Sequence, residues 1–205
     1  MSLIEVPFYN DFYSLISPEN KDEIIEHCMN PDLELPKEEF QWGDECLSEK
    51  VYLKLTGFTE ILKPSIIEVL TEVIDGDIPY GFAVEEVWKN TYHRYYHQEQ
   101  HDHLGYELSF VIFMNDSQEN AARLYFVNER IRVTSPSWID MSTLMGDNFS
   151  IEERKGDIIF FPSHMLHGVS PHRLDTPRTT ISGNISVGQI GKTLYSVNSI
   201  AKKHL

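Results

Sequence analysis

Residues 97–115 read HQEQHDHLGYELSFVIFMN, and this stretch passes from potential metal ligands into a strongly apolar segment. The apolar half, 108–115, is rich in β-branched and aromatic residues and ends at a turn-forming Asn-Asp pair, which predicts a strand. The polar half has five candidate ligands within seven positions, namely His97, Glu99, His101, Asp102 and His103. A solvated loop and a metal site would both look polar, so the strand beside the run decides which side chains can meet.

Strand geometry restricts which of these candidates can bind one ion together. Neighbouring side chains on an extended segment point to opposite faces, whereas residues two apart share a face. The same-face pairs are His97/Glu99, Glu99/His101, Gln100/Asp102 and His101/His103. The last pair lies closest to the apolar strand, on which Ser109, Val111 and Phe113 would share one face.

The rest of the chain predicts a mainly β fold with helices near its N-terminus. Segments rich in β-branched and aromatic residues recur at 82–88, 108–115, 122–127, 131–134, 156–162, 167–171 and 178–187. Short strands at this spacing are typical of a sandwich or jelly roll. Before them, we expect one helix that begins at Ser17-Pro18 and is stopped by Pro31, and a second from Pro64 to near Gly76.

The length of 205 residues favours a single domain, and no linker is visible that would divide the chain in two. Within this domain, 1–205, we expect three regions. They are a helical and mixed support region at 1–80, a β core at 81–190 and a C-terminal tail at 191–205.

The bulk composition narrows the partners and the compartment. The formal net charge of −15 disfavours nucleic acid as a partner, because an acidic surface repels phosphates. The two cysteines, Cys28 and Cys46, fall in no metal-binding pattern and suggest reduced thiols. No signal peptide or membrane-spanning run is visible, so we expect a cytoplasmic protein without a membrane partner.

Three further histidines surround the end of the predicted strand at 156–162, namely His164, His167 and His172. Two histidine clusters far apart in sequence, each beside a strand, are typical of a metal site assembled from two strands. On the next predicted strand, Arg178 carries a guanidinium suited to bidentate binding of a carboxylate ligand beside the metal. Taken alone, an arginine in so acidic a chain would sooner indicate a surface salt bridge. Thr180 and Ser182 share its strand face and would add hydroxyl donors.

Four segments of the chain resemble, in order and spacing, the Fe(II)- and 2-oxoglutarate-dependent oxygenases: HDHLGYELSFVIFMN, LYF, EERKGDIIFFPSHMLHGVSPH and RTTISGNI. The likeness spans residues 84–188 and is strongest with the prolyl-hydroxylase-like group. Within that group, the chain is most similar to bacterial and phage oxygenases that carry an HxH motif in place of HxD. The resemblance implies a double-stranded β-helix, which is a cupin-like jelly roll with the metal at one mouth.

The resemblance also implies that iron binds His101 and His167, with His103 as the third ligand. This last position departs from the usual set of two histidines and one carboxylate, and three neutral histidines would leave the iron more positive. Two alternatives would retain a carboxylate ligand, through Asp102 in a shifted register or through an HxE motif made by His97 and Glu99.

For the cosubstrate, the resemblance implies that Arg178 binds the far carboxylate of 2-oxoglutarate with help from Thr180, and that Tyr92 and Asn90 line the pocket. The implied reaction hydroxylates an unactivated C–H bond in a small molecule or peptide and converts 2-oxoglutarate and O₂ to succinate and CO₂. A peptidyl proline is the substrate that the family favours. Two other classes stay open: a cupin-like metal enzyme that does not use 2-oxoglutarate, and a non-catalytic β-sandwich binding module.

Overall fold

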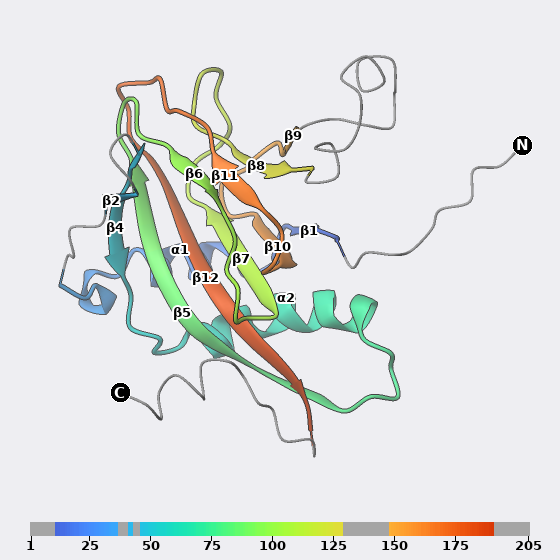
Figure 1. The fold of residues 1–205 in the computed structure, drawn as a ribbon. Helices are drawn as coiled ribbons and strands as arrows, with labels where there is room; N and C mark the ends of the chain where they lie inside the picture. The colour runs from blue at the N-terminus through green and yellow to red at the C-terminus, as the bar shows by residue number, and fades with distance from the viewer. Residues whose placement is uncertain (1–10, 37–40, 43–45, 129–147, 191–205) are drawn as a thin grey trace, which may run out of the picture.

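The apolar stretch that follows the histidine run forms strand β7 (Leu108–Phe113), and all of its side chains are buried. The computed structural model describes residues 11–36, 41–42, 46–128 and 148–190. In this part of the chain, two antiparallel sheets face each other, and β7 lies inside the larger one (Figure 1). This arrangement confirms the predicted mainly β jelly roll with N-terminal helices.

The larger sheet has six strands in the order β1-β10-β7-β12-β5-β4. Their bounds are β1 (Ser14–Ile16), β10 (Ile158–Pro162), β7 (Leu108–Phe113), β12 (Arg178–Gln189), β5 (Tyr80–Tyr92) and β4 (Glu49–Tyr52). The smaller sheet has the order β6-β11-β8-β9, with β6 (Gln98–His101), β11 (His167–Val169), β8 (Leu124–Val127) and β9 (Asn148–Ser150). A short pair, β2 (Gln41–Trp42) and β3 (Cys46–Leu47), forms a separate two-stranded sheet.

Strand alternation divides the apolar residues of the larger sheet between two cores. On β7, Phe110 and Ile112 face the helices, whereas Val111 and Phe113 face the smaller sheet. Strand β10 repeats this division with Ile158 and Phe160 on one side and Ile159 and Phe161 on the other. A strand buried on both faces reads as a continuous apolar run, which explains why these segments are recognisable in the sequence.

The helices cover the outer face of the larger sheet (Figure 1). They are α1 (Lys21–Cys28) and α2 (Phe58–Val73), and a short 3₁₀ helix, η1 (Pro31–Leu33), follows α1. Five residues of α2 form a buried stripe at helical spacing, namely Phe58, Leu62, Ile66, Val69 and Leu70. No helix among these described segments is long and apolar enough to cross a membrane.

Both predicted helix starts are wrong. Helix α1 begins at Lys21, and Pro18 lies in the preceding turn, where its carbonyl accepts a hydrogen bond from the Lys21 N–H. Helix α2 begins after Gly57, which has a positive φ of 81°, so Pro64 lies inside the helix and not at its first position. Pro64 is on the exposed side, where a missing backbone hydrogen bond is tolerated more easily than in the core.

The N-terminal part of the chain contributes more than helices. Strands β1 and β4 come from this part, and they form the two edges of the larger sheet. Strand β5 is longer than the predicted 82–88 and runs along β12 over twelve paired positions. The predicted strand at 131–134 and the predicted tail at 191–205 lie outside the described residues.

Candidate metal centre and cosubstrate pocket

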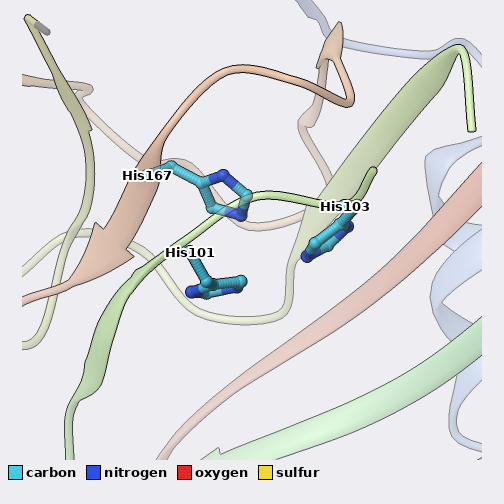
Figure 2. A group of neighbouring side chains, drawn as sticks. All are labelled: His101, His103 and His167. Atoms are coloured by element: carbon cyan, nitrogen blue, oxygen red, sulfur yellow. The ribbon is translucent and has the colours of Figure 1, made fainter. Parts of the chain in front are cut away.

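Three histidines converge at one mouth between the two sheets. His101 ends β6 and is paired across the smaller sheet with His167, which begins β11. His103 follows β6, and its backbone N–H donates to the Ser163 carbonyl just after β10 at 2.8 Å. One ring nitrogen from each histidine lies within 4.8 Å of those of the other two. Figure 2 shows the three rings pointing toward a common space.

The close approach of strands around His167 depends on the glycine that follows it. A Cβ atom on Gly168 would lie 2.7 Å from the Tyr125 hydroxyl and 3.1 Å from the Gln98 carbonyl oxygen. The residue stands between β6 and β8, which both pair with β11. Gly168 therefore lets the strand that carries His167 fit between its neighbours.

Hydrogen bonds fix which nitrogen each histidine presents. The Nδ1 atom of His101 donates to the Glu99 carbonyl oxygen at 2.7 Å, and that of His167 donates to the Met165 carbonyl oxygen at 2.8 Å. The Nδ1 atom of His103 lies 2.7 Å from Oδ1 of Asn184. Because these oxygens accept, each Nδ1 carries the proton and each Nε2 is the unprotonated ring nitrogen. Three Nε2 atoms are thus available as ligands.

Burial also keeps the three rings neutral, as metal ligands must be. Burial, and then the neighbouring His101, lower the pKa of His103 to about 4. Burial likewise lowers the pKa of His101, and it lowers that of His167 well below its usual range. The donor set fits a divalent metal such as iron, because three neutral imidazoles are directed at one point.

The alternative ligands do not join this group. Glu99 and Asp102 are exposed, and Asp102 accepts a hydrogen bond from the Leu104 N–H at 3.4 Å. The His97 ring lies 3.3 Å from the Tyr95 carbonyl oxygen, apart from the cluster. Within the described residues, the only group of potential ligands this close together is His101, His103 and His167.

The two remaining histidines of the second sequence cluster have other roles. His172 is buried, accepts a hydrogen bond from the Ala122 N–H at Nδ1 and lies 2.8 Å from the Thr176 carbonyl oxygen at Nε2. It therefore ties two loops together. His164 lies on the surface and pairs with Asp11 at 3.1 Å.

A pocket opens at the histidines between the two sheets, and β5 and β12 form one of its walls. Three alternate cross-strand pairs line it: Trp88 with Ser182, Asn90 with Thr180 and Tyr92 with Arg178. The four residues expected at the cosubstrate, Arg178, Thr180, Tyr92 and Asn90, thus lie together on one face. Gln98, which the sequence did not single out, closes the pocket from β6 and lies 3.4 Å from Oδ1 of Asn90 through its Nε2.

Arg178 lies at the far end of this pocket and is almost fully buried, at 4% exposure. Its Nε and Nη2 atoms donate to Glu153 at 3.0 and 2.7 Å, so one of the two bidentate edges of the guanidinium is already occupied. The binding of a 2-oxoglutarate carboxylate by Arg178 stays a prediction, and it would use the part of the guanidinium that Glu153 leaves open. The third nitrogen, Nη1, is buried and has no hydrogen-bond partner. Sequence alone did not identify Glu153, because nothing distinguishes it from the other acidic residues of the chain.

Comparison with known proteins agrees with this geometry. Residues 86–184 match the sequence model of a family described as "Putative 2OG-Fe(II) oxygenase". This range includes His101, His103, His167 and Arg178. No curated protein sequence matches the chain.

Solved structures support the same fold at low sequence identity. The 2-oxoglutarate-dependent carbocyclase SnoK from nogalamycin biosynthesis aligns with a TM-score of 0.59 and 13% identity, over 94% of this chain and 86% of that one. The epimerase SnoN from the same biosynthesis gives 0.58 and 12%, over 90% and 81%. A viral collagen prolyl hydroxylase from Paramecium bursaria Chlorella virus-1 gives 0.52 and 13%, over 86% and 96%.

The family match favours an oxygenase over the two other classes considered from the sequence, the cupin-like enzyme without 2-oxoglutarate and the non-catalytic module. Residues 86–184 match the Fe(II)- and 2-oxoglutarate-dependent oxygenases, and this match supports an enzyme whose cofactors are Fe(II) and 2-oxoglutarate.

Proposed function

We propose that the enzyme hydroxylates an unactivated C–H bond, with iron held by His101, His103 and His167 and 2-oxoglutarate held by Arg178. The observation that carries this proposal is the pairing of two features in one pocket. Three neutral imidazoles offer Nε2 at one end, and a buried guanidinium nitrogen without a partner lies at the other. When bound, Fe(II) and 2-oxoglutarate together activate O₂ for C–H oxidation and yield succinate and CO₂.

The histidines contribute orientation and charge. Each ring is fixed by its Nδ1 hydrogen bond, so the three Nε2 atoms do not need to be ordered when the metal arrives. Three protein ligands leave the remaining coordination positions of iron to cosubstrate and oxygen. Because none of the three ligands is an anion, the protein does not reduce the positive charge of the metal.

The residues along β12 and β5 would orient 2-oxoglutarate. Nη1 of Arg178 is the donor for its far carboxylate, and the Thr180 hydroxyl is one cross-strand pair nearer to the metal end. Asn90 and Tyr92 lie opposite these residues on β5. The apolar side chains of Val111, Leu124 and Val169 exclude water from the same pocket, which strengthens each polar contact inside it.

For the substrate, we propose a peptide or a small molecule, and a peptidyl proline is the first candidate to test. A collagen prolyl hydroxylase shares the fold, but so do an epimerase and a carbocyclase. The net charge of −15 argues against nucleic acid as a partner. We further propose that the chain acts as one domain in the cytoplasm.

Anaerobic titration of the purified protein with Fe(II) and then with 2-oxoglutarate tests the proposal. We expect a weak visible charge-transfer band to appear only after 2-oxoglutarate is added, because the cosubstrate chelates the iron. Binding of iron without this band would contradict the cosubstrate role, and failure to bind iron would contradict the metal site. The same titration with His97→Ala, whose side chain lies apart from the cluster, is the matched control.

A further inference from the structure

The partner of Arg178 is held more firmly than a simple ion pair requires. Glu153 is 3% exposed, and its Oε1 atom accepts from the Leu124 backbone N–H at 2.9 Å as well as from Arg178. The backbone of Glu153 makes two hydrogen bonds with Ser117. The Ser117 Oγ accepts from the Glu153 N–H at 3.0 Å, and the Ser117 N–H donates to the Glu153 carbonyl at 2.8 Å. The Glu153 carboxylate is thus a fixed point between β8 and β12.

This fixed carboxylate determines which nitrogens of the Arg178 guanidinium are paired and which remain for another ligand. Two of the three nitrogens of Arg178 face Glu153, and only Nη1 is left over. A buried N–H group without an acceptor is unfavourable, so Nη1 would gain from a ligand that supplies one. Arg178 borders the pocket, and the Tyr92 ring lies 5.2 Å from its guanidinium carbon. Glu153 therefore takes the edge formed by Nε and Nη2, and Nη1 is the nitrogen left without a partner for a ligand in the pocket.

Glu153 also neutralises the positive charge of Arg178, and this matters because His103 replaces a carboxylate at the metal end. With three neutral ligands, the charges of Fe(II) and of the 2-oxoglutarate dianion cancel. The charges of Arg178 and Glu153 cancel as well. In a site with one carboxylate ligand and an unpaired arginine, the net charge of metal, cosubstrate, ligands and arginine would also be zero. The site therefore has its protein carboxylate at Glu153, paired with Arg178, and not among the metal ligands.

We propose that Glu153 is the positioning residue of the cosubstrate clamp, and that it sets both the geometry and the strength of that clamp. This inference rests on the proposed role of Arg178 in binding 2-oxoglutarate. Glu153 occupies the edge formed by Nε and Nη2 and leaves Nη1 for the far carboxylate of the cosubstrate. Because two carboxylates then share one guanidinium and repel each other, Glu153 holds the affinity for that carboxylate below the value that an unpaired arginine would give.

The test compares two oxo acids that differ only at the far end. 2-Oxoglutarate has a second carboxylate and 2-oxovalerate has a methyl group in its place, so the ratio of their dissociation constants reports on the clamp alone. We would measure both constants by anaerobic calorimetry on the Fe(II)-loaded protein. A purely structural role of Glu153 would change both constants by the same factor and leave the ratio unchanged.

For Glu153→Gln, we expect the ratio in favour of 2-oxoglutarate to rise about tenfold, because the isosteric amide keeps the Oε1 acceptor and removes the competing charge. Glu152→Gln is the matched control, since this neighbouring acid is exposed and its loss should leave the ratio unchanged. An unchanged or lower ratio in Glu153→Gln would overturn the inference.

Arg178→Lys provides a second test in a variant that retains the buried ion pair. A lysine has one nitrogen, which Glu153 would hold, so we expect the ratio to fall about tenfold. Adding Glu153→Gln should release that nitrogen, so the ratio of the two dissociation constants should rise part of the way back to the wild-type value. An Arg178→Lys protein with the wild-type ratio would contradict the proposal.

The outcomes for the wild-type protein separate the two claims. If the Fe(II)-loaded protein binds neither oxo acid, the proposed function fails and the inference fails with it. If the wild-type ratio is large but Glu153→Gln leaves it unchanged, the proposed function stands and only the role of Glu153 is lost.

Discussion

The two ends of the pocket bury polar groups in opposite ways. At the histidine end, burial lowers the pKa of each ring and the charge disappears. At the arginine end, the charge stays and a buried carboxylate balances it at 2.7 Å. Neutral groups can be buried with modest hydrogen bonding, whereas a buried ion needs a partner in a fixed place. We therefore expect substitutions at the arginine end to damage the fold, and substitutions at the histidine end to damage metal binding.

The largest effect should come from breaking the ion pair. Glu153→Ala leaves the Arg178 guanidinium buried and unpaired, so we expect the free energy of unfolding to fall by about 3–5 kcal/mol. Urea unfolding followed by circular dichroism measures this loss. Replacing both partners, as Glu153→Leu with Arg178→Met, should recover most of it because no charge is left buried. A loss below about 1 kcal/mol in the single variant would contradict the contrast between the two ends.

The next effect concerns the metal. We expect His167→Ala to weaken Fe(II) binding by more than about a hundredfold, because it removes a proposed ligand and not only a group that orients one. Anaerobic titration with Fe(II) in competition with a chelator measures the affinity. His97→Ala is the control and should bind as the wild type does. If His167→Ala retains the wild-type affinity, the metal is held elsewhere.

The lowered pKa values predict that stability depends on pH at the histidine end. The unfolded chain protonates His103 near pH 6.5, whereas the folded chain does so only near pH 4. Between these values the unfolded state binds more protons, so the free energy of unfolding falls as the pH is lowered from 6.5 toward 4. For the metal-free protein, we expect His103 to account for about 2 kcal/mol of loss between pH 7 and pH 5.

This pH effect is measured by urea unfolding at the two pH values in the wild type and in His103→Asn, which cannot titrate at that position. The variant should lose less stability than the wild type over the same interval. Equal losses in the two proteins would mean that His103 is not buried as a neutral ring.

The smallest effect should come from the amide that orients His103. Asn184 accepts from His103 at Oδ1, and its Nδ2 atom donates to Glu86 at 3.2 Å. We expect Asn184→Ala to weaken Fe(II) binding by about 10-fold, because the ring of His103 is no longer held in one orientation. Asn184→Asp, which keeps an acceptor at this position, should lose less. Equal affinity in Asn184→Ala and the wild type would show that the ring needs no such support.

The two ends also differ in how far the sequence predicts them. Residues two apart share a strand face, so strand alternation by itself groups His101 with His103 and Arg178 with Thr180. The side chains of these pairs do lie together around one pocket. Glu153 could not be found in this way, because its burial depends on a loop that packs against two strands distant in sequence.

Sequence patterns predict the fold, too, only where the local pattern is sufficient. The apolar runs of β7 and β10 predict strands because both faces of each strand are buried. In β5, a register shift opposite Asn184 and Ile185 places Val84 and Val87, three residues apart, in the same core, so strict alternation would misassign one of them. The start of α2 is mispredicted because Pro64 resembles a first helical residue when its surroundings are unknown.

The central claim is that this oxygenase binds iron through three histidines and no carboxylate, and a crystal structure of the protein grown anaerobically with Fe(II) and 2-oxoglutarate tests it most directly. We predict iron bound to Nε2 of His101, His103 and His167, with the far carboxylate of 2-oxoglutarate at Nη1 of Arg178. A carboxylate of Asp102 or Glu99 bound to the iron in place of His103 would contradict the account.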